Sequence, residues 1–367
     1  ITVKANVDLA GGFGLEAAAR EARYAALAAQ LQPGEVLLTA HHQRDQFETL
    51  LLRLLRGAGV HGLAAMSVQS RRGSVKLLRP LLNLPAGLIQ AYASAAGLDW
   101  IDDPSNADVS IDRNFLRHNV LPVLQERWPS ADSAVARAAR LCADAARILD
   151  DVAARDLAGL LDRDRLKLAE LSKLSGPRQR NVVRHALRLR GLAIPSEQQL
   201  RQAMATLTQA GSTAQPEVAW PGVRIRRYRQ HLWLYAEETD PRCAKVPAAS
   251  YSWSPGEVLE MGPVRGTLAA APSTGAGIAA EYFEAPLEVR FRTGGERLRV
   301  APKGRTRELK NLLQETGIVP WMRGHIPLIW TGEHLLAVGD LWVNADFAAR
   351  EDAPGIQLKW EKHSPLC

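Results

Sequence analysis

The chain has 367 residues, of which 46% are hydrophobic and 23% are charged, a composition typical of two or three folded domains. No run of about eighteen apolar residues occurs, so we expect no membrane span. The three cysteines are isolated in sequence, which argues against a disulfide framework and favours a reducing, cytoplasmic location. The net charge of +7 and the pI near 9.5 indicate an acidic partner.

Residues 1–115 alternate between strand and helix patterns. Because a run of β, α, β, α and β elements is typical of a parallel sheet covered by helices, we expect an incomplete parallel-sheet α/β domain here. Apolar runs predict strands over 2–7, 36–39 and 75–78, and helical periodicity predicts helices over 16–31, 43–56 and 88–96.

The stretch over 39–59, TAHHQRDQFETLLLRLLRGAG, gathers polar side chains at a turn between a strand and a helix. His41 and His42 follow the strand, and Asp45 and Glu48 share one helical face by their spacing of three. Ligands of open α/β sheets bind outside the carboxyl ends of strands, so this turn is a candidate active-site edge that can hold a cation. The structural alternative is that the histidines cap the helix and the carboxylates complement its dipole. The spacing disfavours zinc.

The rest of the chain changes character twice. Residues 116–240 are expected to be mainly helical, ending in short β segments, and a high content of Pro, Gly, Ala and Ser over 241–280 is typical of a linker. A small α+β domain is expected over 281–360, with one helix over 306–316. The expected organisation is a partial catalytic domain (1–115), a mainly helical domain (116–240), a linker (241–280) and the α+β domain (281–360).

Basic residues form three clusters. Residues 290–323 hold nine basic residues and three acids, 178–190 hold five arginines without an acid, and 224–229 hold four arginines. A solvated surface is the alternative for each cluster, and helical spacing of four within 178–190 fits an ordinary amphipathic helix. Three clusters in succession favour a folded polyanion such as RNA. The candidate RNA contacts are Arg180, Arg184, Arg297, Lys303, Arg305 and Lys310.

Several separate motifs follow one another along the chain. They are EAAAREARY over 16–24, AHHQRDQFETLLLRLLRGAGVHGL over 40–63, RPLL over 79–82, DDPSN over 102–106, RNFLR over 113–117, RTGGER over 292–297 and KNLLQE over 310–315. Together they resemble the tRNA(Ile)-lysidine synthases, a family of PP-loop (N-type) ATP pyrophosphatases, over about residues 14–342. The family's SGGxDS segment, which cradles the ATP pyrophosphate, is not found in these residues, and because the chain starts at Ile1 we expect a partial sequence.

The resemblance implies a fold, a reaction and partners. It implies an adenine-nucleotide alpha hydrolase-like first domain, a helical tRNA-binding domain and a C-terminal tRNA-binding domain. The implied ligase uses ATP and Mg²⁺ to adenylate the C2 carbonyl oxygen of the wobble cytidine (position 34) of a tRNA(Ile) with a CAU anticodon. L-Lysine then displaces AMP, giving lysidine, and the codon read changes from AUG to AUA. No membrane partner is expected, and a homodimer is one option for the oligomeric state.

The resemblance also assigns expected roles around the strand-to-helix turn. Asp45 is expected to hold the metal or ATP, and Glu48, together with Asp45, to recognise lysine. His41 and His42 are expected to line the nucleotide edge.

Arginines are expected to supply the positive charge of the site. Arg113, with Arg20 or Arg23, is expected near the phosphates and the flipped cytidine, and Arg117 is expected to contact the tRNA. For Arg20, a surface pair with Glu16 is an equal alternative.

Two other readings of the whole chain stay open from the sequence. One is a non-catalytic tRNA-binding protein. The other is tRNA thiolation, which the wide separation of the cysteines disfavours. Trp321 and Trp330 flank Arg323, but tryptophans in a small β-rich domain more often pack in a core than stack on bases.

Overall fold

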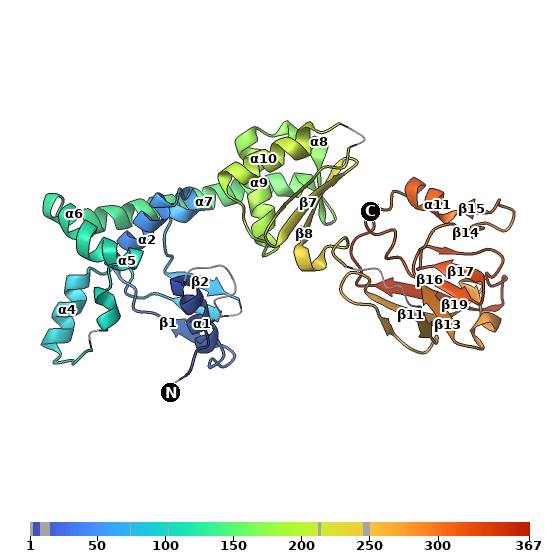
Figure 1. Ribbon diagram of the computed structural model, residues 1–367, viewed down its shortest axis with the longest axis horizontal. Coiled ribbons are helices and arrows are strands. Elements are labelled where there is room, and N and C mark those ends of the chain that lie inside the picture. Colours follow the sequence, from blue (N-terminus) through green and yellow to red (C-terminus); the bar gives the residue numbers. More distant parts are fainter. Residues whose placement is uncertain (1–2, 8–14, 74, 102, 212–213, 245–249) are drawn as a thin grey trace. The chain divides into compact units, whose positions relative to one another are not determined.

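The computed structural model describes residues 3–7, 15–73, 75–101, 103–211, 214–244 and 250–367, with the side chains of residues 15–17 outside the description. The chain divides into two compact units, Ile1–Val152 and Ala153–Cys367, whose elements are labelled in Figure 1. Across these described ranges, no helix combines the length and apolar character needed to cross a membrane.

The first unit contains a three-stranded sheet of β1 (Val36–Leu38), β2 (Gln69–Arg72) and β3 (Val75–Leu78). The strand order is β1-β3-β2, with β1 parallel to β3 and β2 antiparallel to it. The strand predicted over 2–7 is wrong for the described residues 3–7, which form no strand and are exposed. Their alternating pattern suits a strand, but an extended segment without a neighbouring strand gains no ladder hydrogen bonds.

Helices lie beside this sheet, most of them to one side of it (Figure 1). Because Phe47, Glu48 and Leu50 are buried on α2, this helix packs by one face. Arg117 lies in a π-helical turn, η2, a feature that often marks functional sites. The helical elements are α1 (Leu15–Ala28), α2 (Gln43–Leu55), α3 (Val60–Leu63), α4 (Ala86–Ala95), η1 (Pro104–Ala107), α5 (Asp112–Phe115), η2 (Leu116–Val120), α6 (Leu121–Arg127) and α7 (Ala131–Leu160), whose last residues belong to the second unit.

The second unit begins with helices packed on an antiparallel sheet of order β4-β5-β8-β7-β6. Their core contains Leu166, Leu171, Val182, Leu200 and Ile225, all nearly inaccessible to solvent. The short hairpin at the start of this sheet was not expected from the sequence. The elements are β4 (Leu161–Asp162), β5 (Arg165–Lys167), α8 (Leu168–Lys173), α9 (Gly176–Leu189), α10 (Glu197–Gln209), β6 (Glu217–Trp220), β7 (Val223–Tyr228), β8 (His231–Ala236) and η3 (Glu237–Thr239).

The remainder of the second unit is built from a five-stranded sheet, β18-β17-β16-β13-β9, a four-stranded sheet, β10-β11-β19-β12, and the pair β14-β15. Buried tryptophan and aliphatic side chains fill its core. The elements are β9 (Tyr251–Trp253), β10 (Leu259–Glu260), β11 (Thr267–Thr274), β12 (Ile278–Ala279), η4 (Ala280–Phe283), β13 (Leu287–Arg290), β14 (Arg297–Leu298), β15 (Arg307–Glu308), α11 (Leu309–Glu315), β16 (Leu328–Thr331), β17 (His334–Val338), β18 (Trp342–Val343) and β19 (Pro354–Glu361).

The linker expected over 241–280 is wrong for its described residues. Strand β9 pairs with β13, and β11 pairs with β19. Trp253 and Leu268 are buried in the core of the C-terminal sheets. These strands pair with residues tens of positions away, so local composition did not reveal them, and this part of the fold begins well before residue 281.

Candidate functional site

The turn between β1 and α2 is shaped by the helix start. The carboxylate of Asp45 accepts a hydrogen bond from the backbone N–H of His42 at 2.9 Å, which satisfies one of the free donors of the first helical turn. Asp45 therefore also has a structural role, because its carboxylate caps the start of α2. The other oxygen of the same carboxylate faces arginine side chains.

Four charged side chains, Asp45, Glu48, Arg113 and Arg117, form what we call the Glu48 cluster. Glu48 is fully buried, and its two oxygens accept hydrogen bonds from Arg113 Nε at 2.6 Å and Arg117 Nε at 2.7 Å. The Asp45 Oδ1 atom lies 3.4 Å from Arg113 Nη2 and 3.7 Å from Arg117 Nη2. Two residues of α2 are thus joined to two arginines more than sixty positions along the chain.

Charge balance explains why a carboxylate can be buried here. Two guanidinium groups offset the two carboxylates, and the hydrogen bonds to Glu48 raise the pKa of Arg117 above its ordinary value. The side chains of Arg113 and Arg117 are 20% and 29% exposed. Both guanidiniums therefore reach solvent while their Nε atoms donate hydrogen bonds to Glu48. This arrangement fixes two positive groups at the surface.

The neighbouring DPSN and RNFLR motifs hold Arg113 in place. Asn114 is buried and donates from Nδ2 to the carbonyl oxygens of Ser105 at 2.8 Å and Asp108 at 2.9 Å. Asp103 accepts from the N–H of Ser105 at 2.9 Å. Asn114 was not singled out from the sequence, although it stands within RNFLR, and Asp102 of the DDPSN motif lies outside the described residues.

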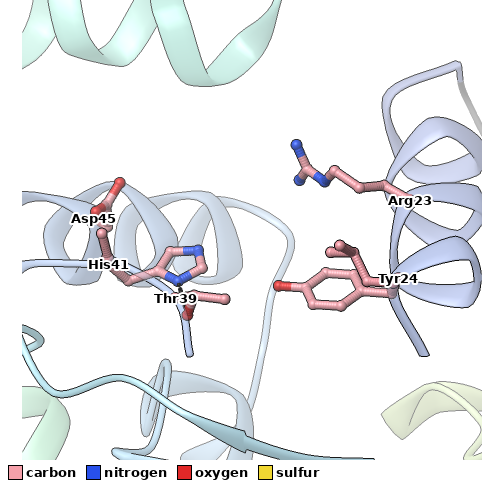
Figure 2. Close-up of a pocket in the computed structure, with 7 residues that line it drawn as sticks. Arg23, Tyr24, Thr39, His41 and Asp45 are labelled. Carbon is pink, nitrogen blue, oxygen red and sulfur yellow. Dashed lines mark hydrogen bonds between the residues drawn. The ribbon is translucent and has the colours of Figure 1, made fainter. Parts of the chain in front are cut away.

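A pocket of about 310 Å³ opens between α1 and the β1–α2 turn. In Figure 2, Arg23 and Tyr24 extend from α1 toward the imidazole of His41. The Thr39 hydroxyl and His41 Nδ1 are 2.7 Å apart, which fixes the ring. The pocket is lined by Arg23, Tyr24, Leu27, Thr39, Ala40, His41 and Asp45.

The electrostatics of this pocket favour an anion. Burial lowers the pKa of His41 to about 4, Asp45 opposes that shift, and the positive charges of Arg79, Arg113 and Arg20 add to it. His41 is therefore neutral at pH 7. Arg20 lies over the ring of Tyr24, with its Cζ atom 5.3 Å from the ring centroid. Its alternative partner, the side chain of Glu16, is outside the described residues.

Two further arginines near this pocket were missed as site residues. Arg79 is buried and donates from Nη1 to the Ser67 carbonyl at 2.8 Å. Arg53 donates from Nη1 to the Gly62 carbonyl at 2.9 Å. Burial lowers the pKa of both guanidiniums, and Arg20 adds to the effect in each case. Both stand within motifs of the sequence: Arg79 begins RPLL, and Arg53 lies in the motif over 40–63.

The described side chains do not support the expectation that Asp45 holds a metal ion. Within the described ranges, no group of three or more His, Cys, Asp or Glu side chains is arranged to hold a metal ion. Asp45 is flanked by two guanidiniums, whereas Mg²⁺ prefers several oxygen ligands in octahedral geometry. These residues do not make a magnesium site by themselves.

The predicted RNA contacts fall into two groups. Arg180 and Arg184 both pair with Glu197 of α10, the first at 3.1 Å. The second group, which lies on or next to β14, β15 and α11, is exposed: Arg297, Lys303, Arg305 and Lys310. The interpretation of 224–229 as a basic binding face is wrong for Arg227, which is buried and donates from Nη1 to the Ala210 carbonyl at 2.8 Å. It is also wrong for the pair Arg224 and Arg226.

Those two arginines belong to what we call the Asp240 network, formed by Glu217, Arg224, Arg226, Asp240 and Arg242. Arg226 is buried and donates from Nη2 to Asp240 at 2.6 Å and from Nε to Glu217 at 2.7 Å. Arg224 donates to Glu217 at 3.0 Å. The alternation in 223–226 correctly indicated a strand, but Glu217 on the neighbouring strand β6 and Asp240 after β8 cover its basic face.

Comparison with known proteins gives matches along most of the chain. Three family models match: a PP-loop domain over residues 1–124, a TilS substrate binding domain over 166–233 and a TilS substrate C-terminal domain over 287–360. A crystal structure of a TilS C-terminal domain matches 32% of this chain and all of its own, at 22% identity and a TM-score of 0.26, too low to carry an argument.

Relatives named tRNA(Ile)-lysidine synthase match over nearly the whole chain. The one from Alkalilimnicola ehrlichii is 43% identical over 96% of this chain and 78% of its own length. Those from Coxiella burnetii and Ralstonia nicotianae are 37% and 40% identical, each over 97% of this chain and 78% of their own length.

Proposed function

The chain belongs to the tRNA(Ile)-lysidine synthase family, and we propose that it uses ATP to join L-lysine to the wobble cytidine of a tRNA(Ile) with a CAU anticodon. The C2 carbonyl oxygen of cytidine attacks the α-phosphorus of ATP, and pyrophosphate leaves. The ε-amine of lysine then bonds to C2, the C2–O bond breaks, AMP departs, and the amine loses a proton. The product, lysidine, pairs with A instead of G.

ATP is the expected occupant of the pocket beside His41. Its phosphates carry negative charge, and Arg20, Arg23 and Arg79 lie on or near the pocket walls. A neutral imidazole adds a hydrogen-bonding group without altering that charge. Arg113 stands at the edge of the same pocket through its contact with Asp45, where a fixed cation stabilises a departing phosphate group.

Lysine is the expected partner of Asp45. Glu48 is fully buried, whereas the side chain of Asp45 is 14% exposed and lines the pocket, so the role first expected for Glu48 passes to Asp45. Glu48 then acts through Arg113 and Arg117 as a positioning residue. No step is assigned to Mg²⁺, because the described side chains do not form a site for it.

The observation that carries this proposal is the Glu48 cluster, which sets two arginines and one accessible carboxylate at the pocket edge. The test is ATP-dependent incorporation of radiolabelled lysine into the CAU-anticodon tRNA(Ile), using protein from the complete reading frame. Arg113→Ala is expected to lower kcat about 100-fold, the effect typical of removing one transition-state donor.

Arg242→Ala is the matched control. Arg242 is also paired with a carboxylate, Glu217 at 2.8 Å, but it belongs to the Asp240 network and is 56% exposed. Its removal is expected to leave kcat unchanged. Equal losses in the two variants, or normal kcat in Arg113→Ala, would contradict the assigned role of the Glu48 cluster. Absence of lysine incorporation by the unmodified protein would contradict the function itself.

A further inference from the structure

A second pocket lies far along the chain from the Glu48 cluster, among the strands labelled β14, β16 and β17 in Figure 1. Its volume is about 380 Å³, within the range of about 300–1,000 Å³ that small ligands occupy. Its walls combine aromatic rings, arginines and hydrogen-bond acceptors. The lining residues on which the argument rests are Glu296, Arg297, Trp330, Glu333, His334 and Asn344.

One wall offers flat aromatic surface. The rings of His334 and Phe347 have centroids 5.5 Å apart and are inclined at 45°, and His334 is exposed at the start of β17. Trp330 is adjacent, with Arg290 Cζ 5.1 Å from its ring centroid. Aromatic and guanidinium planes of this kind are the surfaces on which unstacked RNA bases are bound.

The interior offers polar atoms, one of them a donor with no partner in the described part of the chain. Trp330 Nε1 is buried and has no hydrogen-bond partner among the described residues, whereas Glu296 Oε2 is ion-paired with Arg292 Nε at 3.4 Å. Asn344 is buried, and its Nδ2 donates to the Leu335 carbonyl at 2.9 Å. A set of donors and carboxylate acceptors matches the edge of a nucleobase, whose amino groups donate to Glu or Asp.

The rim carries the positive charge that an RNA backbone requires. Arg297 is exposed, and Thr306 lines the pocket next to the exposed Arg305. Arg299 is paired with Asp346 and Arg307 with Glu315, so neither adds net charge. The exposed carboxylate of Glu333 also lines the pocket, and this mixture of charges distinguishes it from a simple phosphate site.

We propose that this C-terminal pocket binds one unstacked nucleotide of the substrate tRNA, with His334 as the stacking surface and Arg297 on its phosphate. The proposal rests on the proposed function, which makes tRNA the substrate. The exposed lysines and arginines make electrostatic contacts with any RNA backbone. The pocket adds a contact that requires a single-stranded nucleotide. tRNA affinity then depends on a base being available outside a helix.

The test is equilibrium binding of the tRNA to the full-length protein, together with a blunt-ended RNA duplex of matched length. His334→Ala is expected to weaken tRNA binding about tenfold by removing one stacking surface, and to leave duplex binding unchanged. His334→Tyr, which keeps a ring, is expected to bind tRNA as the unmodified protein does. Unchanged tRNA binding in His334→Ala, or an equal loss on the duplex, would overturn the proposal.

Charge is tested separately. Arg297→Ala is expected to weaken tRNA binding and to reduce the slope of log affinity against log salt by about one. Lys359→Ala, which removes an exposed positive charge on β19 outside the pocket, is the matched control and is expected to change neither quantity. An equal effect of the two substitutions would contradict a specific role for Arg297.

Steady-state kinetics separates this proposal from the proposed function. His334→Ala is expected to raise the KM for tRNA about tenfold with kcat unchanged, because the pocket binds substrate and takes no part in the chemistry. A fall in kcat at saturating tRNA would contradict that assignment. If the unmodified protein did not incorporate lysine, the proposed function would be contradicted. The comparison of tRNA binding with duplex binding would still test whether the C-terminal pocket binds an unstacked nucleotide.

Discussion

The Glu48 cluster and the Asp240 network are built from the same residue types but differ in their access to solvent. In each, a fully buried carboxylate binds two arginines. In the Asp240 network, Arg226 is only 3% exposed and also lies beneath the rings of Tyr235 and Trp321. In the Glu48 cluster, the guanidiniums stay partly exposed beside a pocket.

This difference separates a structural role from a binding role. In the Asp240 network the central pair of Arg226 and Asp240 is sealed from solvent, and the acids cancel the basic character of the strand that carries Arg224 and Arg226. A cluster that buries the carboxylate and leaves the cations accessible fixes positive charge where an anion can reach it. Arginine content alone does not distinguish the two cases, but the position of the partner acid does.

The largest expected effect is on stability in the sealed network. Asp240→Asn leaves the buried Arg226 with only Glu217, and the free energy of unfolding is expected to fall by about 3 kcal/mol. Glu48→Gln is expected to cost about 2 kcal/mol, because water can partly solvate the released arginines. The midpoints of urea unfolding measure both. A larger loss for Glu48→Gln would contradict the comparison.

Glu217 of the Asp240 network and His41 of the pocket beside the Glu48 cluster are expected to make the free energy of unfolding depend on pH in different ranges. Hydrogen bonds from Arg226 lower the pKa of Glu217 from 4.5 to about 2, so the stabilisation is present above pH 4.5 and is lost as the pH falls toward 2. We expect this contribution to be about 2 kcal/mol. Glu217→Gln is expected to abolish the loss measured by urea unfolding in that range.

His41 is expected to act at higher pH. Its pKa is lowered from 6.5 to about 4, so between these values the unfolded chain binds the proton more readily, and stability falls as the pH drops below 6.5. The free energy of unfolding is expected to fall by about 1 kcal/mol over this range, a small loss because the ring is partly solvated. His41→Gln is expected to flatten the pH dependence between 6.5 and 4 while leaving the Glu217 range intact. A dependence unchanged in His41→Gln would show that another group titrates there.

The sequence predicted several elements of the first unit, whose signals lie within a few residues, but it missed β2 and placed a strand over 2–7 that the described residues 3–7 do not form. Strand β3 was expected over 75–78 and is observed at Val75–Leu78, and the helix expected over 43–56 is observed at Gln43–Leu55. Strands β9 and β11 were missed because their partners, β13 and β19, lie far along the chain. The local composition resembled that of a linker, but pairing with these distant strands makes the segment part of the folded sheets.

For the candidate site, residue types were easier to predict than contacts. Asp45, Glu48 and Arg113 were all selected from the sequence, and the structure brings them together. That Glu48 is buried beneath two arginines depends on a contact across 65 positions with Arg113, which spacing on one helix does not contain. The acids that cover Arg224 and Arg226 were missed because Glu217 lies on the paired strand β6 and Asp240 follows β8, contacts that the alternation within 223–226 does not contain.

The smallest expected effect concerns basic residues that were predicted together. Arg180 pairs with Glu197 at 3.1 Å, whereas Lys310 is exposed on α11. Lys310→Ala is expected to weaken tRNA binding about threefold and to lower the salt slope by about one, while Arg180→Ala changes the slope by much less, because the acid already offsets its charge. Glu197→Ala is the informative control, since it releases Arg180 and Arg184 and is expected to tighten tRNA binding. Equal salt slopes for the Lys310 and Arg180 variants would mean that pairing with an acid does not decide which arginines reach the RNA.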